Sequence, residues 1–399
     1  MEHDNSLGGA FNKETGELNT DKLREHFKNL KGIKESKMNI LLMGYTGSGK
    51  SSLINALFGK EIAKAGVGKP ITQHLEKYID EQKGLILWDT KGIEDKDYHY
   101  TMQSIKKEME DSFKTLDEKE AIDVAYLCVK ETSGRVQERE RELLSFAKDW
   151  NIPTIVVFTH TQAEAGEAFV QESKGIIDEE WGFKGFVRDY VRVNSVAFSF
   201  RGLKVPVEGL EELVDETKKC LSDAEKNKRR HFLSIQKVKI QERKQAMIEE
   251  CKTIIHVASG VAGAAGLIPI PFSDAFAIAP IQAGMIYKMN DAFEVSLGKS
   301  ATPTSITEIS SVIALAHVER TLVNGFLKLI PGAGSVVGAA ISGATAVVIT
   351  EGIGFAYLKV LEKCFNDETG EVKLPAVDVI TSLFKENYLN LDTIKKLKS

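Results

Sequence analysis

The feature that most constrains this chain is a glycine-rich loop that joins an apolar run to an amphipathic one. The loop, residues 44–51, fits the pattern GxxxxGK[ST] with the letters GYTGSGKS. A loop that wraps a phosphate must point several backbone N–H groups inward, and glycine permits the backbone angles that this needs. The run Met38–Met43 predicts a buried strand before the loop, and Ser51–Leu57 predicts a helix after it. The loop is therefore predicted to bind nucleotide phosphates through Gly44, Tyr45, Thr46, Gly47, Ser48, Gly49, Lys50, Ser51 and Ser52.

Two side chains of this loop and a second motif carry the expected phosphate and metal chemistry. The amine of Lys50 is predicted to reach the β- and γ-phosphates, and the hydroxyl of Ser51 to ligate Mg²⁺. The motif DTKG, residues 89–92, follows the apolar run Leu85–Trp88. A carboxylate at the end of a neighbouring strand can hold the Mg²⁺ shell, and a glycine N–H there can bind the γ-phosphate. Asp89 and Gly92 are therefore assigned these two roles.

A switch threonine, whose hydroxyl binds the metal ion only when the γ-phosphate is present, is expected between the two motifs. The segment between Ser51 and Thr90 contains a single threonine, Thr72, within the letters PITQ. Its hydroxyl is predicted to complete the Mg²⁺ shell when the γ-phosphate is present, which orders the surrounding loop. The expected metal ligands are therefore Ser51, Thr72 and Asp89, and the groups expected to act on the γ-phosphate are Lys50, Thr72 and Gly92.

The expected base-recognition segment departs from the usual pattern. The apolar run Ile152–Phe158 is followed by the letters THTQ, where guanine-specific proteins usually carry NKxD or TKxD. His160 can stack on a purine, whereas Gln162 is a poor acceptor for two guanine N–H groups, and Glu164 is a nearby carboxylate. Guanine is favoured as the base, with adenine as the alternative. The residues predicted to contact the base are Thr159, His160, Gln162, Glu164, Asn194 and Ser195.

The residue that follows the DTKG motif is Ile93, at a place where many related enzymes have a glutamine that orients water. An isoleucine side chain cannot orient the attacking water. Hydrolysis of the bound nucleotide is therefore expected to be slow unless a partner or a second copy of the chain contributes the missing group. Gln73, His74 and Arg135 are the candidates from this chain.

The fold expected for residues 21–221 is an α/β domain with a mainly parallel sheet and helices on both faces. Short apolar runs alternate with charged helical stretches, which is typical of βαβ units. Residues 1–20 are polar and are expected to form a flexible tail. The runs expected to be strands are Met38–Met43, Leu85–Trp88, Ala121–Val129, Ile152–Phe158 and Val191–Ser195.

The composition changes after residue 221. Residues 222–252 are charged and locally basic and predict a connecting helix. Residues 253–399 predict an all-α domain rich in small residues: between Thr253 and Tyr287 the only charged residue is Asp274. The letters LIP occur at 267–269 and again at 329–331, which suggests a degenerate helix–LIP–helix repeat.

Overall charge and cysteine content restrict the partners and the compartment. The net charge is −5, which gives no reason to expect a specific nucleic-acid partner. Four cysteines without CxxC spacing argue against a zinc site or a disulfide framework and favour a reducing compartment. The N-terminus lacks the basic-then-apolar build of a signal peptide, so a cytoplasmic protein is expected. The glycine-interrupted segments Thr253–Ser273 and Gly332–Thr350 favour a compact bundle over insertion in a bilayer, with peripheral membrane contact expected through the basic residues of Lys226–Lys244.

Residues 38–221 resemble an Era-type G domain of the translation-factor class, with the letters GYTGSGKS, ITQ and WDTKG in order. The histidine in the base motif resembles that of the chloroplast import-receptor GTPases. The region from about 254 to 365 resembles the helical domain of unknown function that follows such G domains in bacterial YcjF-like proteins. The letters GLIPIPFSDAFAIAPIQAGMIYKM (266–289) and LIPGAGSVVGAA (329–340) carry that resemblance.

This resemblance implies a Mg²⁺-dependent protein that binds GTP and hydrolyses it to GDP and phosphate as a switch. The helical domain would be its output or a membrane-associated module, and self-association through the G domain as a homodimer would supply catalysis. Two alternatives remain open. One is a nucleotide-binding scaffold without significant hydrolysis. The other is a nucleotide-gated protein whose helical hairpins insert in a membrane.

Overall fold

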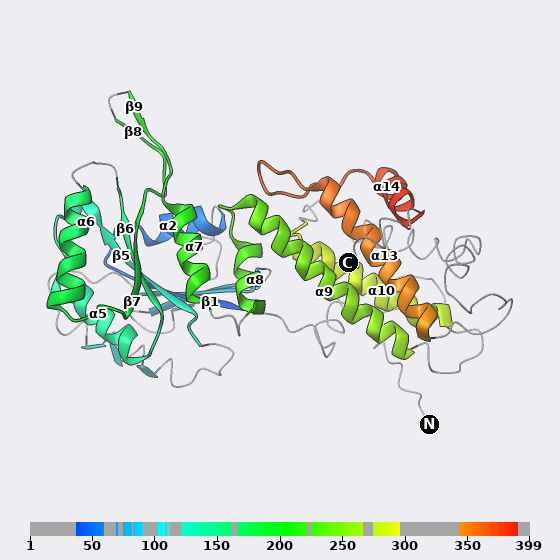
Figure 1. Ribbon diagram of the computed structural model, residues 1–399, viewed down its shortest axis with the longest axis horizontal. Helices are drawn as coiled ribbons and strands as arrows, with labels where there is room; N and C mark the ends of the chain where they lie inside the picture. The colour runs from blue at the N-terminus through cyan, green and yellow to red at the C-terminus, as the bar shows by residue number, and fades with distance from the viewer. Residues whose placement is uncertain are drawn as a thin grey trace. The chain divides into compact units, whose positions relative to one another are not determined.

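The computed structural model forms two compact units, one ending at Arg243 and the other beginning at Lys244. Figure 1 shows the ribbon of both units. The structure describes residues 37–59, 69–70, 75–81, 83–90, 103–104, 106–107, 110–111, 121–161, 166–200, 202–221, 226–265, 274–295 and 343–389.

A seven-stranded sheet organises the first unit, in the order β2-β3-β4-β1-β5-β6-β7. Strands β4, β1, β5, β6 and β7 run parallel to one another, while β3 pairs antiparallel with both β4 and β2. The parallel strands are short and apolar, because both of their faces are covered by helices. The strands are β1 (Met38–Met43), β2 (Lys69–Pro70), β3 (Leu75–Asp80), β4 (Leu85–Thr90), β5 (Val124–Lys130), β6 (Thr154–Thr159) and β7 (Val187–Val193).

Helices cover both faces of this sheet and bury a separate apolar core on each (Figure 1). On one face α5 and α6 pack over strand side chains such as Leu127 and Val156. On the other face α2, α7 and α8 pack over side chains such as Ile40 and Val157. The predicted α/β fold with a mainly parallel sheet is therefore confirmed. The helices are α2 (Lys50–Phe58), α5 (Glu138–Asp149), α6 (Gly166–Gly175), which continues as η4 (Ile176–Glu180), α7 (Leu210–Cys220) and α8 (Lys226–Ile235), and the short turn η3 (Glu131–Ser133) follows β5.

Strand β3 is the longest of the strands that the apolar runs did not predict. Its letters LEKYID place only Leu75 fully inside, and its other side chains are half-buried or exposed. Such a strand owes its pairing to β4, with Tyr78 opposite Leu87, and the amine of Lys77 lies 4.5 Å from the centre of the Trp88 ring. Near the outer edge of the sheet a strand needs no continuous apolar run, and so its sequence resembles that of a loop.

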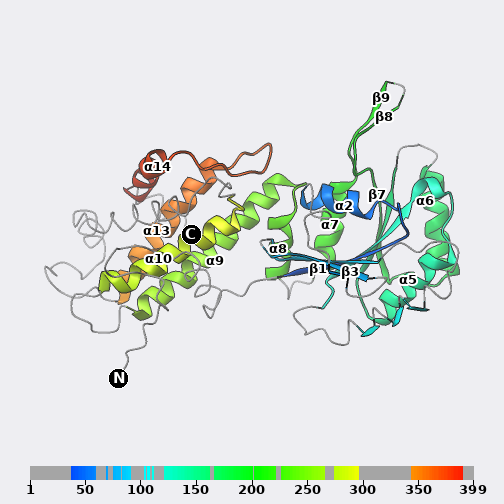
Figure 2. The same ribbon diagram turned by 180° about the vertical axis from the view of Figure 1, so that it is seen from behind.

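A two-stranded hairpin follows β7 and projects from the sheet unit in Figures 1 and 2. Its strands are β8 (Phe198–Phe200) and β9 (Leu203–Val205), which pair antiparallel. The chain returns to the sheet through a backbone bridge between Asn194 and Glu208. Strand β7 therefore ends at Val193, two residues before the predicted end.

The basic stretch after residue 221 contains two helices rather than one. Helix α8 belongs to the sheet unit: Phe232 and Ile235 join its core, and the rings of Phe58 and Phe232 meet edge to face at 6.2 Å. The amine of Lys228 pairs with Asp123, whose other carboxylate oxygen accepts the backbone N–H of Asn39 at 2.7 Å. Helix α8 is thus held on the sheet by packing and by charge.

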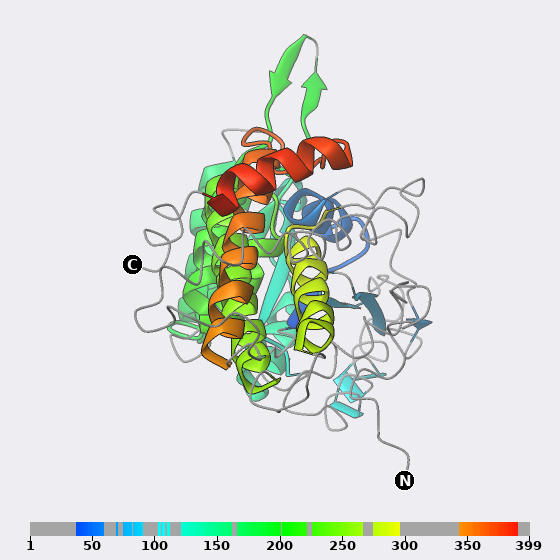
Figure 3. The ribbon, with the colours of Figure 1, turned by 90° about the vertical axis from the view of Figure 1, so that its right-hand side faces the viewer.

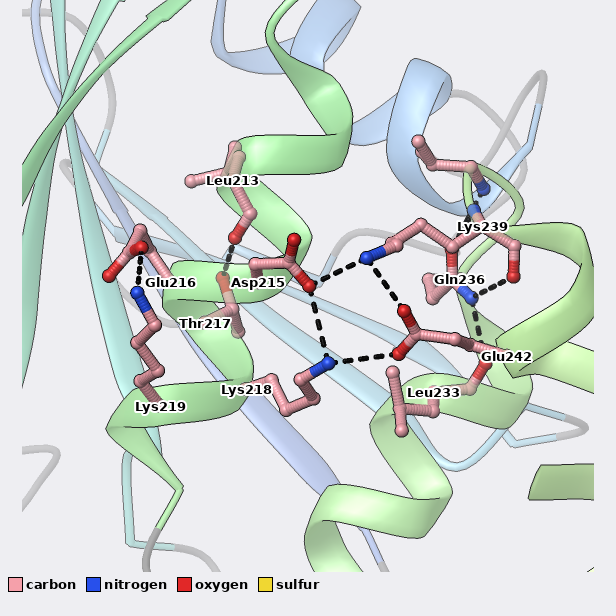
Figure 4. A network of polar contacts seen from close by, with 11 residues as sticks. Leu213, Asp215, Glu216, Thr217, Lys218, Lys219, Leu233, Gln236, Lys239 and Glu242 are labelled. Atoms are coloured by element: carbon pink, nitrogen blue, oxygen red, sulfur yellow. Dashed lines mark hydrogen bonds and ion pairs between the residues drawn. The ribbon is translucent and has the colours of Figure 1, made fainter. Parts of the chain in front are cut away.

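A charged cluster fixes the beginning of the next helix, α9 (Ile240–Ala265), on α7 (Figure 4). The amine of Lys239 lies 2.7 Å from Asp215 and 2.6 Å from Glu242. The amine of Lys218 lies 3.2 Å and 2.9 Å from the same two carboxylates. The guanidinium of Arg243 is buried and donates to the carbonyl of Ser234 at 3.0 Å. Several of the basic residues in the range 226–244 therefore serve intramolecular contacts.

Helices make up most of the described part of the second unit. In it α9 continues beside α10 (Asp274–Ala292) and α13 (Gly343–Cys364), and α14 (Val377–Leu389) lies across α13 (Figure 3). Small residues let two of these helices approach closely. A Cβ on Gly263 would lie 2.6 Å from Val347, and one on Gly354 would lie 2.6 Å from Ile255. The predicted helical region rich in small residues is thus confirmed, whereas both LIP segments lie outside the described residues.

Helices in the described part of the chain are all too short or too polar to cross a membrane. The segments Thr253–Ser273 and Gly332–Thr350 are described only at residues 253–265 and 343–350.

Candidate functional site

A pocket of about 420 Å³ lies beside the glycine-rich loop. It is placed by the parallel sheet, because the loop follows β1 and the carboxyl ends of β4 and β6 meet at the same edge. Ligands of open α/β sheets bind in this position, outside the carboxyl ends of the strands. The residues that line the pocket are Thr46, Gly47, Gly49, Lys50, Ser51, Ser52, Asp89, Thr90 and His160.

The backbone of the loop requires glycine at its two ends. Gly44 has φ +141°, and a Cβ there would lie 2.6 Å from the carbonyl oxygen of Cys128. Gly49 has φ +89° at the N-cap of α2, and a Cβ there would crowd Thr159 and His160 at 3.2 Å. Both positions are in the region that only glycine adopts freely. The loop is therefore a tight turn that packs against β5 and β6 and leads directly to the N-terminus of α2.

Lys50 is the charged group of the loop. Its side chain is 8% exposed, and its amine donates to the carbonyls of Gly44 at 2.8 Å and Tyr45 at 3.3 Å. The same amine lies 3.7 Å from the carboxylate of Asp89. The lysine therefore folds back over its own loop and places a positive charge at the pocket wall.

Asp89 supplies the opposite charge from β4. Its Oδ1 is buried and accepts no hydrogen bond from any described residue. Burial raises the pKa of this carboxyl to about 6, although the nearby Lys50 amine lowers it, and Glu76 raises it further. A buried carboxylate oxygen that accepts no hydrogen bond is suited to a hard cation. Ser51 lines the same pocket, and the two residues fit Mg²⁺ as oxygen donors.

Across the described residues, no cluster of three or more His, Cys, Asp or Glu side chains is placed to hold a metal ion by itself. Mg²⁺ commonly binds through one or two protein oxygens together with substrate phosphates and water. Ser51 and Asp89 both line the pocket, and their role as Mg²⁺ ligands stays a prediction, while Thr72 lies outside the described residues.

Asp89 leads to a pH-dependent prediction for the nucleotide-free protein. Its folded pKa of about 6 lies above the value of 3.8 for a free carboxyl. The stability contributed by the neutral carboxyl is therefore present below about pH 4 and is lost as the pH rises through 6. Asp89→Asn carries no ionisable group at this position and so does not lose this stability as the pH rises. The free energy of unfolding of the variant minus that of the wild type should therefore increase between pH 4 and pH 7, by on the order of 2 kcal/mol.

Urea denaturation in EDTA at several pH values measures this difference. Asp149→Asn, at the exposed end of α5, is the control for removing a carboxylate outside the pocket. A difference for Asp89→Asn that does not change with pH would contradict the burial of this carboxylate.

The end of β6 is joined to the loop by Thr159. Its hydroxyl donates to the carbonyl of Ser48 at 2.7 Å, although the two residues are 111 positions apart. The Nδ1 atom of His160 lies 3.1 Å from the same hydroxyl, so a neutral imidazole that carries its proton on Nδ1 donates to it. Partial burial, and secondly the charge of Lys130, lower the pKa of His160. The imidazole is therefore neutral at pH 7. His160 lines the pocket, and its backbone is in the left-handed region, with φ +58°.

The other predicted base contacts are placed differently. The amide of Asn194 is buried and donates to the carbonyl of Pro206 at 2.5 Å, and its backbone pairs with Glu208. Ser195 is half-buried beside it, and neither residue lines the pocket. Thr159 therefore contacts the phosphate loop, and His160 contacts Thr159. Asn194 instead bonds to Pro206 and Glu208 and so closes the loop that contains β8 and β9.

Several predicted residues lie outside the described residues. These are Thr72, Gly92, Gln162 and Glu164, together with Gln73, His74 and Ile93. Arg135 is described: it is exposed on the turn after β5 and does not line the pocket.

Two features of the site were not predicted. Thr90 lines the pocket, and its hydroxyl donates to the carbonyl of Leu42 at 3.1 Å, which ties β4 to β1. The guanidinium of Arg139, from α5, lies 4.3 Å from the centre of the Tyr45 ring. Thr90 lies inside the DTKG motif and was open to prediction, whereas no sequence pattern links Arg139 to a loop more than 90 residues earlier.

The chain is similar to known GTPases in this region. The model of a family described as 50S ribosome-binding GTPase matches residues 39–160. GTPase Der of Clostridium botulinum, strain Okra (type B1), is 29% identical over 143 residues, as is that of strain Langeland (type F). Each match covers 34% of this chain and 31% of the relative, so the chain spans about a third of the length of the curated relatives it matches.

Among solved structures, a probable GTP-binding protein EngB is 17% identical with a TM-score of 0.33, covering 46% of this chain and 97% of that one. The G domain of the FeoB iron transporter of T. maritima is 18% identical with a TM-score of 0.28, covering 47% and 99%. The C-terminal helical region stays unidentified, and its resemblance to YcjF-like proteins remains an expectation. Residues 39–160 are a P-loop GTPase domain of the translation-factor class, similar to the 50S ribosome-binding GTPases.

Proposed function

We propose that this protein is a Mg²⁺-dependent switch that binds GTP and hydrolyses it to GDP and phosphate. The observation that carries the proposal is the convergence of three groups on one pocket: the amine of Lys50, the Ser51 position and the buried carboxylate of Asp89. A cation, a hydroxyl and a carboxylate whose Oδ1 is buried without a hydrogen bond suit a nucleotide triphosphate with its magnesium ion.

In the proposed complex the loop residues bind and orient the phosphates. Backbone N–H groups of the loop other than that of Ser48, which donates to Tyr45, surround the β-phosphate. Lys50 leaves its two carbonyl partners to neutralise the β- and γ-phosphates. Ser51 and Asp89 hold Mg²⁺, which neutralises charge on the phosphates when bound. Thr72 and Gly92 are proposed to contact the γ-phosphate and so to make the surrounding segments respond to it.

The base is proposed to stack on the neutral imidazole of His160. Thr159 supports this arrangement because its hydroxyl fixes both His160 and the loop carbonyl of Ser48. Gln162 or Glu164 is proposed to accept the guanine N–H groups. Asn194 was expected to contact the base, but its amide already serves Pro206, so Ser195 is the better candidate for a second base contact.

Hydrolysis by the isolated chain is proposed to be slow, because Ile93 cannot orient water. A second copy that docks through its G domain would supply the missing group, which makes the rate depend on protein concentration. The helical region is proposed to be the output of the switch. Peripheral attachment to a membrane through residues 226–244 has less support, because Lys228, Lys239 and Arg243 serve contacts within the sheet unit.

Titration calorimetry with GTP, GDP, ATP and ADP, with Mg²⁺ or with EDTA, tests the proposal on the full chain. We expect GTP and GDP to bind at least about tenfold more tightly than the adenine nucleotides, because a base site built on hydrogen bonds leaves polar groups unpaired with the wrong base. We expect GTP affinity to fall in EDTA. Equal affinity for GTP and ATP would remove guanine recognition from the proposal.

Phosphate release at several protein concentrations separates a switch from a scaffold. The switch predicts slow release whose rate per molecule rises with concentration. GTP binding without phosphate release at any concentration would favour a nucleotide-binding scaffold, the alternative suggested by Ile93 and the altered base motif.

A further inference from the structure

The side chain of Tyr45 is the part of the phosphate loop that reaches outside the loop. Its own backbone carbonyl accepts two hydrogen bonds that shape the loop, from the N–H of Ser48 at 3.1 Å and from the amine of Lys50 at 3.3 Å. Whatever fixes Tyr45 therefore also fixes a carbonyl that holds one turn of the loop and, before nucleotide binds, the amine of Lys50.

The ring of Tyr45 is covered by a buried cation. The Arg139 guanidinium carbon lies 4.3 Å from the ring centre, and Arg139 is 9% exposed. A guanidinium over an aromatic face is attracted by the ring quadrupole, and the attraction is strongest when water is excluded. Tyr45 and Arg139 thus form a contact between the loop and the first turn of α5.

Arg139 is itself held rigidly. Its Nε donates to Glu140 Oε1 at 3.0 Å, and the side chain of Glu140 is 2% exposed. The other oxygen of Glu140 accepts the backbone N–H of Gln137 at 2.8 Å, which caps the N-terminus of α5. The guanidinium therefore keeps one orientation without help from a ligand, and it does not line the pocket.

We propose that Arg139 is a positioning residue for the phosphate loop. Through the ring of Tyr45 it holds the loop in the shape that receives phosphates, and it raises nucleotide affinity without touching the nucleotide. This inference rests on the proposed function, because it assigns a role toward the same pocket. The contact joins α5 to the loop, so a change at Arg139 acts on phosphate binding through Tyr45.

Single and double variants of the two residues test this on the full chain, with Mg²⁺-GTP affinity as the measurement. Arg139→Met and Tyr45→Leu should each weaken binding about tenfold. The double variant should be no weaker than either single variant, because the same contact is lost in all three. Tyr45→Phe, which keeps the ring, and Arg139→Lys, which keeps a cation, should recover most of the affinity.

Lys148→Met is the matched control. This lysine lies on the same helix, and its amine is 5.3 Å from the ring centre of Phe183, so the variant removes a cation–ring contact away from the loop. GTP affinity should be unchanged. Tyr45→Leu keeps the Arg139–Glu140 pair intact and guards against misfolding of Arg139→Met. Additive losses, or an Arg139→Met affinity equal to that of the control, would overturn the inference while wild-type binding still stands.

Hydrogen exchange in the nucleotide-free protein keeps the test independent of binding. The amide of Ser48, which donates to Tyr45, should exchange about tenfold faster in Arg139→Met, while the amide of Val157 in β6 keeps its wild-type rate. If the wild type binds no nucleotide, the proposed function fails, and this measurement alone decides the role of Arg139. Unchanged exchange at Ser48 would then refute it.

Discussion

Replacing Lys50 by alanine is expected to weaken the binding of Mg²⁺-GTP at least about a hundredfold and to leave the domain folded. Hydrogen bonds to charged groups contribute about 1.5–3 kcal/mol each, and contacts to two phosphates together reach that factor. The fold should survive because the amine donates to two carbonyls of its own loop and takes no part in either apolar core.

A second lysine provides the control for this result. Lys77 lies on β3, with its amine over the ring of Trp88 and away from the pocket lining. Lys77→Ala should keep GTP affinity within about twofold of wild type, which is less than 0.5 kcal/mol. Calorimetry gives the affinities, and urea denaturation shows whether each variant is folded. An affinity for Lys50→Ala within threefold of wild type would remove Lys50 from the phosphate site.

The largest loss of stability is expected from Gly209→Ala. Gly209 is the N-cap of α7, with φ +77°, and a Cβ there would lie 1.8 Å from the carbonyl oxygen of Arg192. The atom in the way is backbone of β7, which cannot move without breaking the pairing of β7 with β6. Strain and overlap together should lower the free energy of unfolding by about 4 kcal/mol or more.

Gly202→Ala is the matched control for the backbone angle alone. Gly202 has φ +86° between β8 and β9, and a Cβ there meets no described atom within 4 Å. Its cost should be about 1–2 kcal/mol, the ordinary cost of a left-handed residue. Urea denaturation of both variants measures the difference. Equal losses would mean that the contact with Arg192 is unimportant, and that the angle alone decides.

Residues close together in the chain made much of the site predictable. The phosphate loop depends on the spacing of Gly44, Gly49 and Lys50 after one apolar run, and the structure places Gly49 and Lys50 with Asp89 at one pocket. The buried parallel strands were equally readable, because a strand covered on both faces must be apolar along its length. Local pattern therefore determined the fold class and the position of the pocket.

Polar pattern misled the prediction where the partner of a segment was distant. The basic letters of residues 222–252 predicted one connecting helix, whereas the structure has two helices there. Lys228 meets Asp123 across 105 positions, and Lys239 meets Asp215. Strand β3 looked like loop because only its pairing with β4 makes it a strand. A charge in the sequence does not reveal which opposite charge it will face.

The sequence by itself thus determined the chemistry of the loop, since a glycine-rich turn before a helix is a local property of consecutive residues. The tertiary structure alone decided what holds that loop in place. Thr159 reaches the carbonyl of Ser48, and Arg139 covers the ring of Tyr45, each from an element far along the chain. The orientation of the Asn194 amide likewise depends on a tertiary contact, its hydrogen bond to the carbonyl of Pro206. These contacts depend on how helices and strands pack across the sheet, and packing brings together residues that no spacing in the sequence relates.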